Sequence, residues 1–462
     1  MPVGRIIKRS IFVLILAGLS YGLYYISQAL PILAGYGAKD LCSCVMIAGR
    51  NPEDVIKNEL GTSLLSLGKF SVNYEDSSAS GSVFGLGKQK ALYRKGLGCT
   101  LVAEMREAEL RQQKIITPKP PILDQDTLDW PMGNRTSDSI VSGIRYDKLN
   151  ATLDSAFAEP GPKKSRRTRA VVVVYDGRII AEKYAAGFDI HSKQIGWSMT
   201  KSITNALIGI LVKQGKLNIN DPASVDAWKN DDRRNITIND LLHASSGLKW
   251  EENYGGPSGA TNMLFRKKDM GLYAAEVPLQ YEPGKVFYCS SGTTNILSRI
   301  VRETLGDETY YTFPYQELFY KIGMNNIVLE PDAGGTFVGS SYAFAPARDW
   351  ARFGMLYLND GVWNGERILP EGWVKYSSTP APGAPLGEYG AQFWLNAGAR
   401  GNPEKRVFPD VPTDLFYADG FEGQSIFILP SRKLVVVKLS LSQGEYLDDN
   451  AFLKGIIEAL PN

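Results

Sequence analysis

The feature that most restricts the fold of this chain is a stretch near its N-terminus, residues 10–38, that contains no charged residue. Residues 11–23 are strongly apolar, and residues 24–26 and 29–34 continue the run. About 20 consecutive apolar residues are enough to cross the hydrocarbon core of a bilayer as a helix, where no water can satisfy backbone polar groups. The stretch therefore predicts a transmembrane signal anchor, with a long signal peptide as the alternative.

The charges around this stretch predict its orientation. Arg5, Lys8 and Arg9 precede it, and positive flanking charges remain on the cytoplasmic side of a membrane. We therefore expect residues 1–40 to anchor the chain in the cell inner membrane, with the rest of the chain on the periplasmic side. In an exported chain, Cys99 could form a disulfide with Cys42 or Cys44, and the sequence leaves the choice open.

The composition argues against several classes of function. The net charge is only +2, and no long basic run is interleaved with aromatic residues, so we expect no nucleic-acid partner. The chain has two histidines, no histidine–cysteine spacing typical of zinc sites, and neither a phosphate-binding loop nor a dinucleotide-binding glycine motif. We therefore expect no metal and no cofactor. A length of 462 residues predicts two or three folded units. The hydrophobic content of 44% is sufficient for a sizeable core.

The order of predicted elements indicates an α+β fold. Strands are predicted at residues 170–175 and 178–184, joined by Asp176-Gly177, and again at 425–429 and 433–438, followed by a helix at 449–460. These strands most simply pair in one antiparallel sheet flanked by helices, while residues 241–369 form an additional helical subdomain. We assign residues 130–462 to this domain, and residues 41–129 to an N-terminal extension of unknown role.

The clearest chemical signal is Ser198 with Lys201, at the start of a segment whose apolar residues recur at helical spacing as far as Gly215. A serine hydroxyl needs a neighbouring base to become a nucleophile. A lysine one helical turn away can be that base if burial disfavours its charged form. The same four-residue spacing occurs at Ser66 and Ser246, so the motif alone is also compatible with a buried serine and a lysine that reaches solvent.

Two later segments add candidate site residues. Trp250 and Tyr254 lie in a loop where they could line a substrate cleft or simply pack at a loop edge. Tyr288 follows a Pro-Gly turn and precedes Ser290 by two residues. A tyrosine there could relay a proton to a leaving group, although most tyrosines are half-buried packing residues.

A third segment, residues 419–424, leads into the strand at 425–429. Gly423 would let a substrate approach the backbone closely, and the amide of Gln424 together with that of Ser198 could form an oxyanion hole. Glu422 lies beside both residues. The alternative is an ordinary β-turn leading into an edge strand.

In their order along the chain, these motifs resemble those of the serine β-lactamase/penicillin-binding superfamily, and most closely class C β-lactamase-like hydrolases such as the 6-aminohexanoate-dimer hydrolases and related esterases. The resemblance rests on Ser198-x-x-Lys201, Ser246-Gly247-Leu248, Tyr288-x-Ser290 and Gly420-x-x-Gly423-Gln424, and extends from about residue 130 to the C-terminus. It implies an acyl-enzyme on Ser198, with Lys201 and Tyr288 exchanging its proton and the amides of Ser198 and Gln424 binding the oxyanion.

Two departures from this family's pattern bear on the substrate. Ser290 stands where true β-lactamases usually have asparagine, and Phe421-Glu422 stands where they usually have a cation followed by a hydroxyl. Glu422 would repel the carboxylate of a β-lactam, so a small neutral or amine-bearing amide or ester is the expected substrate. The alternatives are β-lactamase or D-alanyl peptidase activity, or a retired hydrolase fold that serves as an envelope binding protein. The oligomeric state is unknown from the sequence.

Overall fold

A computed structural model describes residues 2–137, 140–161 and 164–461. The chain forms two compact units, neither of which is continuous in sequence. Unit 1 comprises Met1–Arg94, Cys99–Gln112 and Glu251–Lys268, and unit 2 comprises Lys95–Gly98, Gln113–Trp250 and Asp269–Asn462. The middle of the chain thus contributes the short helix α7 (Gly259–Arg266) to the same unit as the N-terminus.

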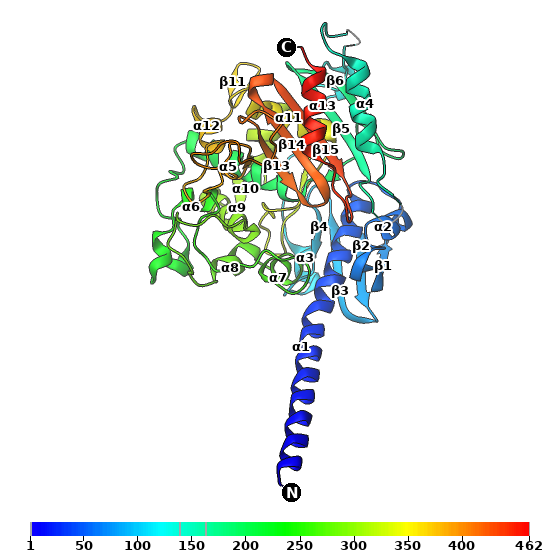
Figure 1. Cartoon of the computed structure of the whole chain (residues 1–462), viewed down its shortest axis with the longest axis vertical. Helices are drawn as coiled ribbons and strands as arrows, with labels where there is room; N and C mark the ends of the chain where they lie inside the picture. The colour runs from blue at the N-terminus through cyan, green and yellow to red at the C-terminus, as the bar shows by residue number, and fades with distance from the viewer. Residues whose placement is uncertain (1, 138–139, 162–163, 462) are drawn as a thin grey trace. The chain divides into compact units, whose positions relative to one another are not determined.

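The N-terminal apolar stretch forms one continuous helix, α1 (Pro2–Met46). Between residues 7 and 27 its side chains are almost all exposed, and burial begins at Gln28. Figure 1 shows the first half of α1 projecting away from the sheet of its own unit, and the second half packed against that sheet. Within the described residues, this helix is long and apolar enough to cross a membrane, as a membrane anchor or a signal sequence would be.

The second half of α1 packs on an antiparallel sheet of order β1-β2-β3-β4. The strands are β1 (Gly68–Asn73), β2 (Ser78–Val83), β3 (Leu86–Arg94) and β4 (Gly98–Leu101). The short helices α2 (Pro52–Asn58) and α3 (Glu107–Gln112) complete the unit. Glycine allows the close approach of helix and sheet, because a Cβ at Gly81 would lie 2.5 Å from the carbonyl oxygen of Ala34. A disulfide between Cys42 and Cys99 ties α1 to β4, while the buried Cys44 keeps its thiol, which donates to Asp40 at 3.7 Å.

The main sheet of unit 2 has the order β12-β13-β14-β15-β5-β6, and every neighbouring pair is antiparallel. Its strands are β12 (Trp394–Leu395), β13 (Phe416–Gly420), β14 (Gln424–Leu429), β15 (Leu434–Ser440), β5 (Thr168–Tyr175) and β6 (Arg178–Tyr184). Val172 pairs with Val437, so strands from the two ends of the domain meet at the centre, as predicted. β-Branched side chains fill both faces of these central strands because both faces are buried.

Helices cover the two faces of this sheet. Helices α4 (Tyr146–Phe157) and α13 (Asp449–Ala459) pack on the face that carries Val173 and Val436. Helix α11 (Ala347–Leu358) packs on the other face, where Gly354 lets it approach Val435 closely. Alternate residues of a strand point to opposite faces, so consecutive valines serve both helical layers. The predicted α+β architecture is confirmed.

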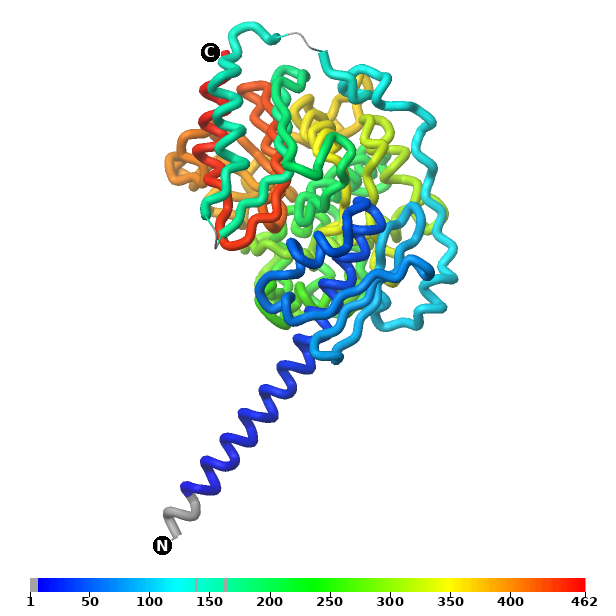
Figure 2. The backbone as a smooth tube through the Cα atoms, turned by 90° about the vertical axis from the view of Figure 1, so that its right-hand side faces the viewer, coloured from blue at the N-terminus to red at the C-terminus, as the bar shows by residue number. Residues whose placement is uncertain are grey.

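The remaining elements of unit 2 are mostly helical, and several of them lie within residues 241–369, the segment predicted to form an additional helical subdomain. They are α5 (Thr200–Lys213), α6 (Ile238–Leu242), α8 (Met270–Ala275), α9 (Ser291–Leu305), α10 (Asp307–Tyr310) and α12 (Trp373–Ser377), with a small sheet of β7 (Gln194–Ile195), β9 (Ala343–Ala345) and β8 (Val328–Leu329) and a hairpin of β10 (Val362–Trp363) and β11 (Glu366–Arg367). Residues 200–211 of α5 are all buried, so this helix lies in the interior of this part. Figure 2 shows the two helices on the outer face of the main sheet, α4 in teal and α13 in red, side by side.

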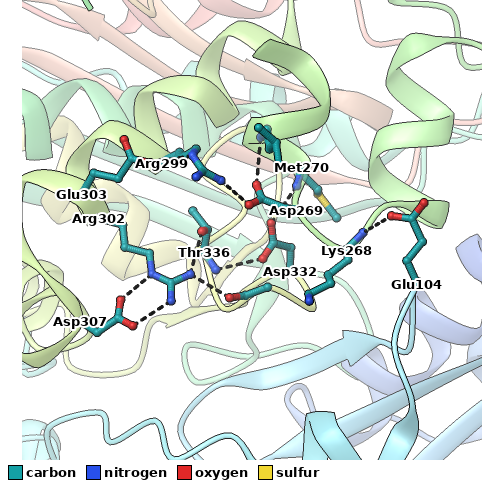
Figure 3. A network of polar contacts seen from close by, with 12 residues as sticks. Glu104, Lys268, Asp269, Met270, Arg299, Arg302, Glu303, Asp307, Asp332 and Thr336 are labelled. Atoms are coloured by element: carbon teal, nitrogen blue, oxygen red, sulfur yellow. Dashed lines mark hydrogen bonds and ion pairs between the residues drawn. The ribbon is translucent and has the colours of Figure 1, made fainter. Parts of the chain in front are cut away.

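A buried carboxyl group fixes the loop that follows β8. The side chain of Asp332 accepts hydrogen bonds from the backbone amides of Met270 and Thr336, both at 2.9 Å (Figure 3). Arg302 of α9 binds Asp307 at 2.7 Å and the hydroxyl of Thr336 at 3.1 Å. Burial raises the pKa of Asp332 to about 7, and the backbone amides only partly offset this effect. The network holds the start of α8, the loop and α9 together, and α9 in turn carries part of the candidate site.

Candidate active site

Ser198 lies in a single 3₁₀ turn, Trp197–Met199, that leads directly into α5. The predicted amphipathic helix is confirmed, and it ends at Lys213, two residues before Gly215. Trp197 has a φ of 45°, a left-handed conformation that is costly for a bulky residue. Its ring is held edge-on by Tyr342 and Phe421, with centroids 6.2 and 5.9 Å away. The packed indole therefore maintains a sharp bend immediately before Ser198.

Lys201 contacts Ser198 in the structure, as its position one helical turn away predicted. Its Nζ lies 2.7 Å from Ser198 Oγ, 3.1 Å from Ser291 Oγ and 3.3 Å from the carbonyl oxygen of Ser340. Only 4% of Lys201 is exposed, and no carboxylate within the described parts of the chain lies at ion-pair distance from it. Three neutral oxygen acceptors thus orient the amine toward the serine hydroxyl.

The first residue of α9, Ser291, supplies the second of these acceptors. The preceding residue, Ser290, was predicted for this region, and its side chain instead caps α9 by accepting a hydrogen bond from the amide of Thr293 at 3.0 Å. The sequence interpretation missed Ser291. A signal was present, because serine is favoured as an N-cap and the helical pattern begins directly after Ser290.

Tyr288 lies in the loop before α9, and 47% of it is exposed. Its backbone amide donates to the carbonyl oxygen of Ala244 at 2.9 Å, which fixes the loop close to the end of α6. Cys289, between Tyr288 and the capping Ser290, is half-buried and forms no disulfide. A role for Tyr288 in proton transfer stays a prediction.

The turn from β13 to β14 lies against the backbone that precedes Ser198. Gly420 pairs with Gln424, and a Cβ on Gly420 would lie 2.3 Å from the carbonyl oxygen of Gly196. The side chain of Gln424 donates to the carbonyl oxygens of Phe421 at 3.1 Å and Ser440 at 2.6 Å, and accepts from the amide of Ser440 at 3.0 Å. These bonds anchor the turn to β15, so its position relative to Ser198 is fixed on both sides.

Two consecutive residues of this turn have left-handed backbones. Glu422 has a φ of 62° and Gly423 a φ of 87°. Glu422 is largely buried, and its carbonyl oxygen accepts from the amide of Ser442 at 2.9 Å. Gly423 leaves no room for a side chain, because a Cβ there would lie 2.9 Å from Ser442 Oγ. The turn is therefore held in a strained conformation next to the serine, as is common at functional sites.

Asp419, which precedes this turn, is a titratable group that the sequence interpretation missed. Its side chain reaches the surface, yet dense protein surroundings of the carboxyl group raise the pKa of Asp419 to about 6. The positive charge of Lys438 opposes this shift, and that of Lys201 adds a smaller opposing effect. A carboxyl group that titrates near neutral pH therefore lies within electrostatic range of the lysine beside Ser198.

The two predicted aromatic residues have different surroundings. The ring of Trp250 packs on the first turn of α9, where a Cβ at Gly292 would lie 2.8 Å from it, and meets Tyr273 edge-on at 6.3 Å. Trp250 is thus placed next to the helix end that carries Ser291. Tyr254 belongs to unit 1, is exposed, and donates its hydroxyl to Glu252 at 2.8 Å.

The antiparallel sheet with helices on both faces defines a β-lactamase-like fold, in which a serine paired with a buried lysine lies at the start of a buried helix. Residues 153–457 match the family model described as β-lactamase, and the chain belongs to this family. The family that the sequence motifs resembled is confirmed.

Several proteins that this chain is similar to are named as hydrolases. The 6-aminohexanoate-dimer hydrolase of Paenarthrobacter ureafaciens is 25% identical over 305 residues, which cover 59% of this chain and 72% of that protein. The structure of a Bacillus anthracis protein assigned as a 6-aminohexanoate-dimer hydrolase has a TM-score of 0.56 at 22% identity, covering 71% of this chain and 89% of that one. EstCE1, a hydrolase with promiscuous acyltransferase activity, has a TM-score of 0.53 at 16% identity, covering 69% and 98%.

Proposed function

We propose that this protein is a membrane-anchored serine hydrolase that cleaves small amides or esters through an acyl-enzyme on Ser198. The observation that carries the proposal is the 2.7 Å contact between Ser198 Oγ and the Nζ of a lysine that is 4% exposed. A serine hydroxyl becomes an effective nucleophile when an adjacent base is positioned to take its proton.

In the proposed acylation step, Ser198 Oγ attacks the substrate carbonyl carbon while its proton passes to a neutral Lys201 Nζ. The bond from the carbonyl carbon to the leaving nitrogen or oxygen then breaks, and that atom receives the proton from Lys201, directly or through Tyr288. Water next attacks the acyl-enzyme, Lys201 accepts one proton from it, and Ser198 recovers its hydroxyl hydrogen as the acid departs. Ser291 and the carbonyl of Ser340 keep the amine in place throughout.

The proposed oxyanion site consists of the backbone amides of Ser198 and Gln424. The amide groups of such a site must be preorganised, because their benefit comes from needing no rearrangement when charge develops. The side-chain bonds of Gln424 to Phe421 and Ser440, and the left-handed Gly423, support this role.

The expected substrate is a neutral or amine-bearing amide or ester. Next to the proposed oxyanion site, the chain offers the half-exposed ring of Phe421 and the acidic Glu422, and neither attracts a carboxylate. Glu422 would favour a cationic amine if its carboxylate faces the substrate. The amide named in the curated relative, 6-aminohexanoate dimer, is an example of such chemistry.

The proposed location is the cell inner membrane, with both compact units on the periplasmic side. The exposed apolar part of α1 supports the anchor. The Cys42–Cys99 disulfide supports an oxidising compartment, because such bridges persist outside the cytoplasm.

Labelling with a fluorophosphonate, which reacts with activated serines, tests the proposal. We expect the detergent-solubilised full-length protein to be labelled, Ser198→Ala to be unlabelled, and Lys201→Met to label at least 100-fold more slowly, with the same thermal melting for all three. Tyr288→Phe separates a proton relay from a surface tyrosine, since only a relay slows turnover of amides and esters. An unlabelled but folded wild-type protein would contradict the proposal, and efficient acylation by penicillin would contradict the substrate assignment.

A further inference from the structure

We propose that unit 1 docks on the surface of the bilayer that α1 crosses, through a sheet end that inserts apolar side chains and binds anionic phospholipid headgroups. This sheet end, called here the docking tip, consists of Leu64, Leu67, Phe84 and Leu86, with Lys69 and Lys88 directly behind them. The inference rests on the proposed anchoring by α1 and extends it to a second membrane contact that orients the folded unit.

The docking tip exposes four large apolar side chains at one end of the sheet of unit 1. Phe84 is 72% exposed and Leu86 61%, and Leu64 and Leu67 are also exposed. The strand register brings Leu67, Phe84 and Leu86 together, because Gly68 pairs with Val83 and Val83 pairs with Leu86, and Leu64 lies in the short 3₁₀ helix that ends at Leu67. Leu67 therefore adjoins the turn that carries Phe84. A contiguous exposed apolar patch of this kind marks an interaction surface.

The turn itself does not require Phe84. Phe84 and Gly85 form the two-residue connection between β2 and β3, with φ values of 51° and 75°. Asparagine or aspartate is favoured at the first of these positions, and the left-handed backbone there is strained for a bulky residue. The ring packs on nothing in the core, since most of its surface is exposed. A partner outside the folded unit explains a phenylalanine at this position.

The docking tip lies where the exposed apolar part of α1 ends. A Cβ on Gly87 would lie 2.8 Å from the carbonyl carbon of Leu30 and 2.9 Å from the nitrogen of Pro31, so the start of β3, two residues after the β2–β3 connection, touches α1 there. The exposed stretch of the helix ends at Ser27, three residues earlier, which is about 5 Å along a helix. Figures 1 and 2 both show the β2–β3 turn beside α1 where the helix leaves the sheet.

The length of the exposed helix matches a bilayer. Residues 7–27 span about 30 Å, which is the thickness of the hydrocarbon core. Tyr24 and Tyr25, both exposed, lie at the end of this stretch nearest the docking tip, where tyrosines are enriched at membrane interfaces. A helix that crosses the membrane over these residues places the docking tip at the level of the headgroups.

A polar groove on the sheet lies directly behind the apolar side chains. It has a volume of about 510 Å³, and its lining includes Lys69, Lys88 and Lys90 together with serines of β1 and β2. Lys90 is neutralised by Asp76 at 2.7 Å and Glu107 at 3.0 Å. Within the described residues, neither Lys69 nor Lys88 has a carboxylate at ion-pair distance, and both are exposed. Two uncompensated cations beside hydroxyl groups form a suitable site for phosphate oxygens.

The order of apolar and basic residues in the docking tip identifies the partner as a bilayer. Along the strands, Leu67 and Leu86 come first, and Lys69 and Lys88 each follow two residues later. Acyl chains and headgroup phosphates occur in the same order in a leaflet, and lysines at that depth attract anionic lipids. The tether provided by α1 keeps the docking tip at the membrane surface, so even a weak contact is populated.

Fluorescence quenching in nanodiscs tests the proposal with the full-length protein. An environment-sensitive nitrobenzoxadiazole label is attached to a single introduced cysteine, in a chain whose two cysteines outside the disulfide are replaced by Cys44→Ala and Cys289→Ser. Phe84→Cys probes the docking tip, and the apolar label keeps an apolar group there. Tyr74→Cys is the matched control, since Tyr74 is equally exposed in the β1–β2 turn at the other end of the sheet. Leu16→Cys reports on α1 itself.

In phosphatidylglycerol nanodiscs, we expect lipid-attached nitroxides to quench the labels at 84 and 16, and aqueous iodide to quench the label at 74. Lys88→Gln should reduce the docked fraction relative to the undocked fraction about fivefold. Lys57→Gln, an exposed lysine of α2, should change nothing, and phosphatidylcholine should abolish the effect of Lys88→Gln. Quenching at 16 without quenching at 84 would overturn the docking contact and leave the anchor intact. Loss of lipid quenching at 16 as well would overturn the anchor and, with it, this inference.

Discussion

Gly420 provides a direct test of how the β13–β14 turn positions Ser198. Its φ of −131° is accessible to any residue, so Gly420→Ala adds no backbone strain. The new Cβ would nevertheless lie 2.3 Å from the carbonyl oxygen of Gly196 and 3.0 Å from the Cβ of Gln424. Relief of the first contact requires a displacement of about 1 Å between the turn and the backbone before Ser198, because backbone atoms cannot rotate away as side chains do.

This displacement predicts a loss of activity that is larger than the loss of stability. Overpacking by one methyl group costs about 1–3 kcal/mol of the free energy of unfolding, which an ordinary domain tolerates. A misplacement of about 1 Å between the nucleophile and the groups that bind the developing oxyanion lowers turnover about 100-fold. We therefore expect Gly420→Ala to fold, to melt somewhat below the wild type, and to react with fluorophosphonate about 100-fold more slowly.

Gly177→Ala is the matched control. Gly177 has a φ of 77° in the β5–β6 turn, and a Cβ there would meet no atom within 4 Å. The substitution costs about 1 kcal/mol through backbone strain and leaves Ser198 untouched. Labelling rates and thermal melts of the two variants should thus separate a site effect from a general loss of stability. A Gly420→Ala protein that labels at the wild-type rate would refute the role of this contact.

Three further outcomes are expected from substitutions elsewhere. Ser291→Ala should slow fluorophosphonate labelling about 10- to 100-fold at unchanged melting temperature, whereas Ser290→Ala should lose about 1 kcal/mol of stability with near-normal labelling; the opposite pattern would return the role to Ser290. Cys42→Ser removes the disulfide to Cys99, whose two cysteines are 57 residues apart, and should lower the free energy of unfolding of unit 1 by about 4 kcal/mol in urea. An unchanged free energy of unfolding would show that the disulfide contributes nothing to stability. Burial raises the pKa of Asp332 from 3.8 to about 7, so its contribution to stability is fully present below pH 3.8 and is lost as the pH rises to about 7. The unfolding free energy of Asp332→Asn should therefore fall less steeply over that pH range than that of the wild type. Equal slopes for the two proteins would contradict this reasoning.

Local patterns in the sequence predicted the elements that local physics determines. The valine runs of β5 and β15 are fully buried strands because β-branched side chains pack on both faces of a central strand. The helix that begins at Ser198 follows from apolar residues at helical spacing, and this spacing also placed Lys201 one turn from the serine. Interactions between residues three or four apart need no knowledge of the rest of the chain, so the serine–lysine pair was predictable.

Contacts between distant segments decided the rest of the site. Ser290 and Ser291 are adjacent and chemically identical, and only the direction of α9 relative to α5 decides which hydroxyl meets Lys201. The raised pKa of Asp419 depends on how densely protein atoms surround its carboxyl group, which no local pattern records. The sequence showed a turn before Gln424, but not that Gly420 touches the backbone of Gly196.

The N-terminal region shows the same division. The absence of charge over residues 10–38 was sufficient to predict an apolar helix, because such a stretch has no other way to satisfy its backbone in a membrane. That its second half belongs to a folded unit, and that residues 251–268 join the same unit, followed only from the tertiary structure. The sequence by itself determined which segments form helices and strands and which serine has a lysine one turn away. The packing of segments far apart in the chain decided which hydroxyls, carboxylates and apolar side chains meet, because those contacts depend on the whole fold.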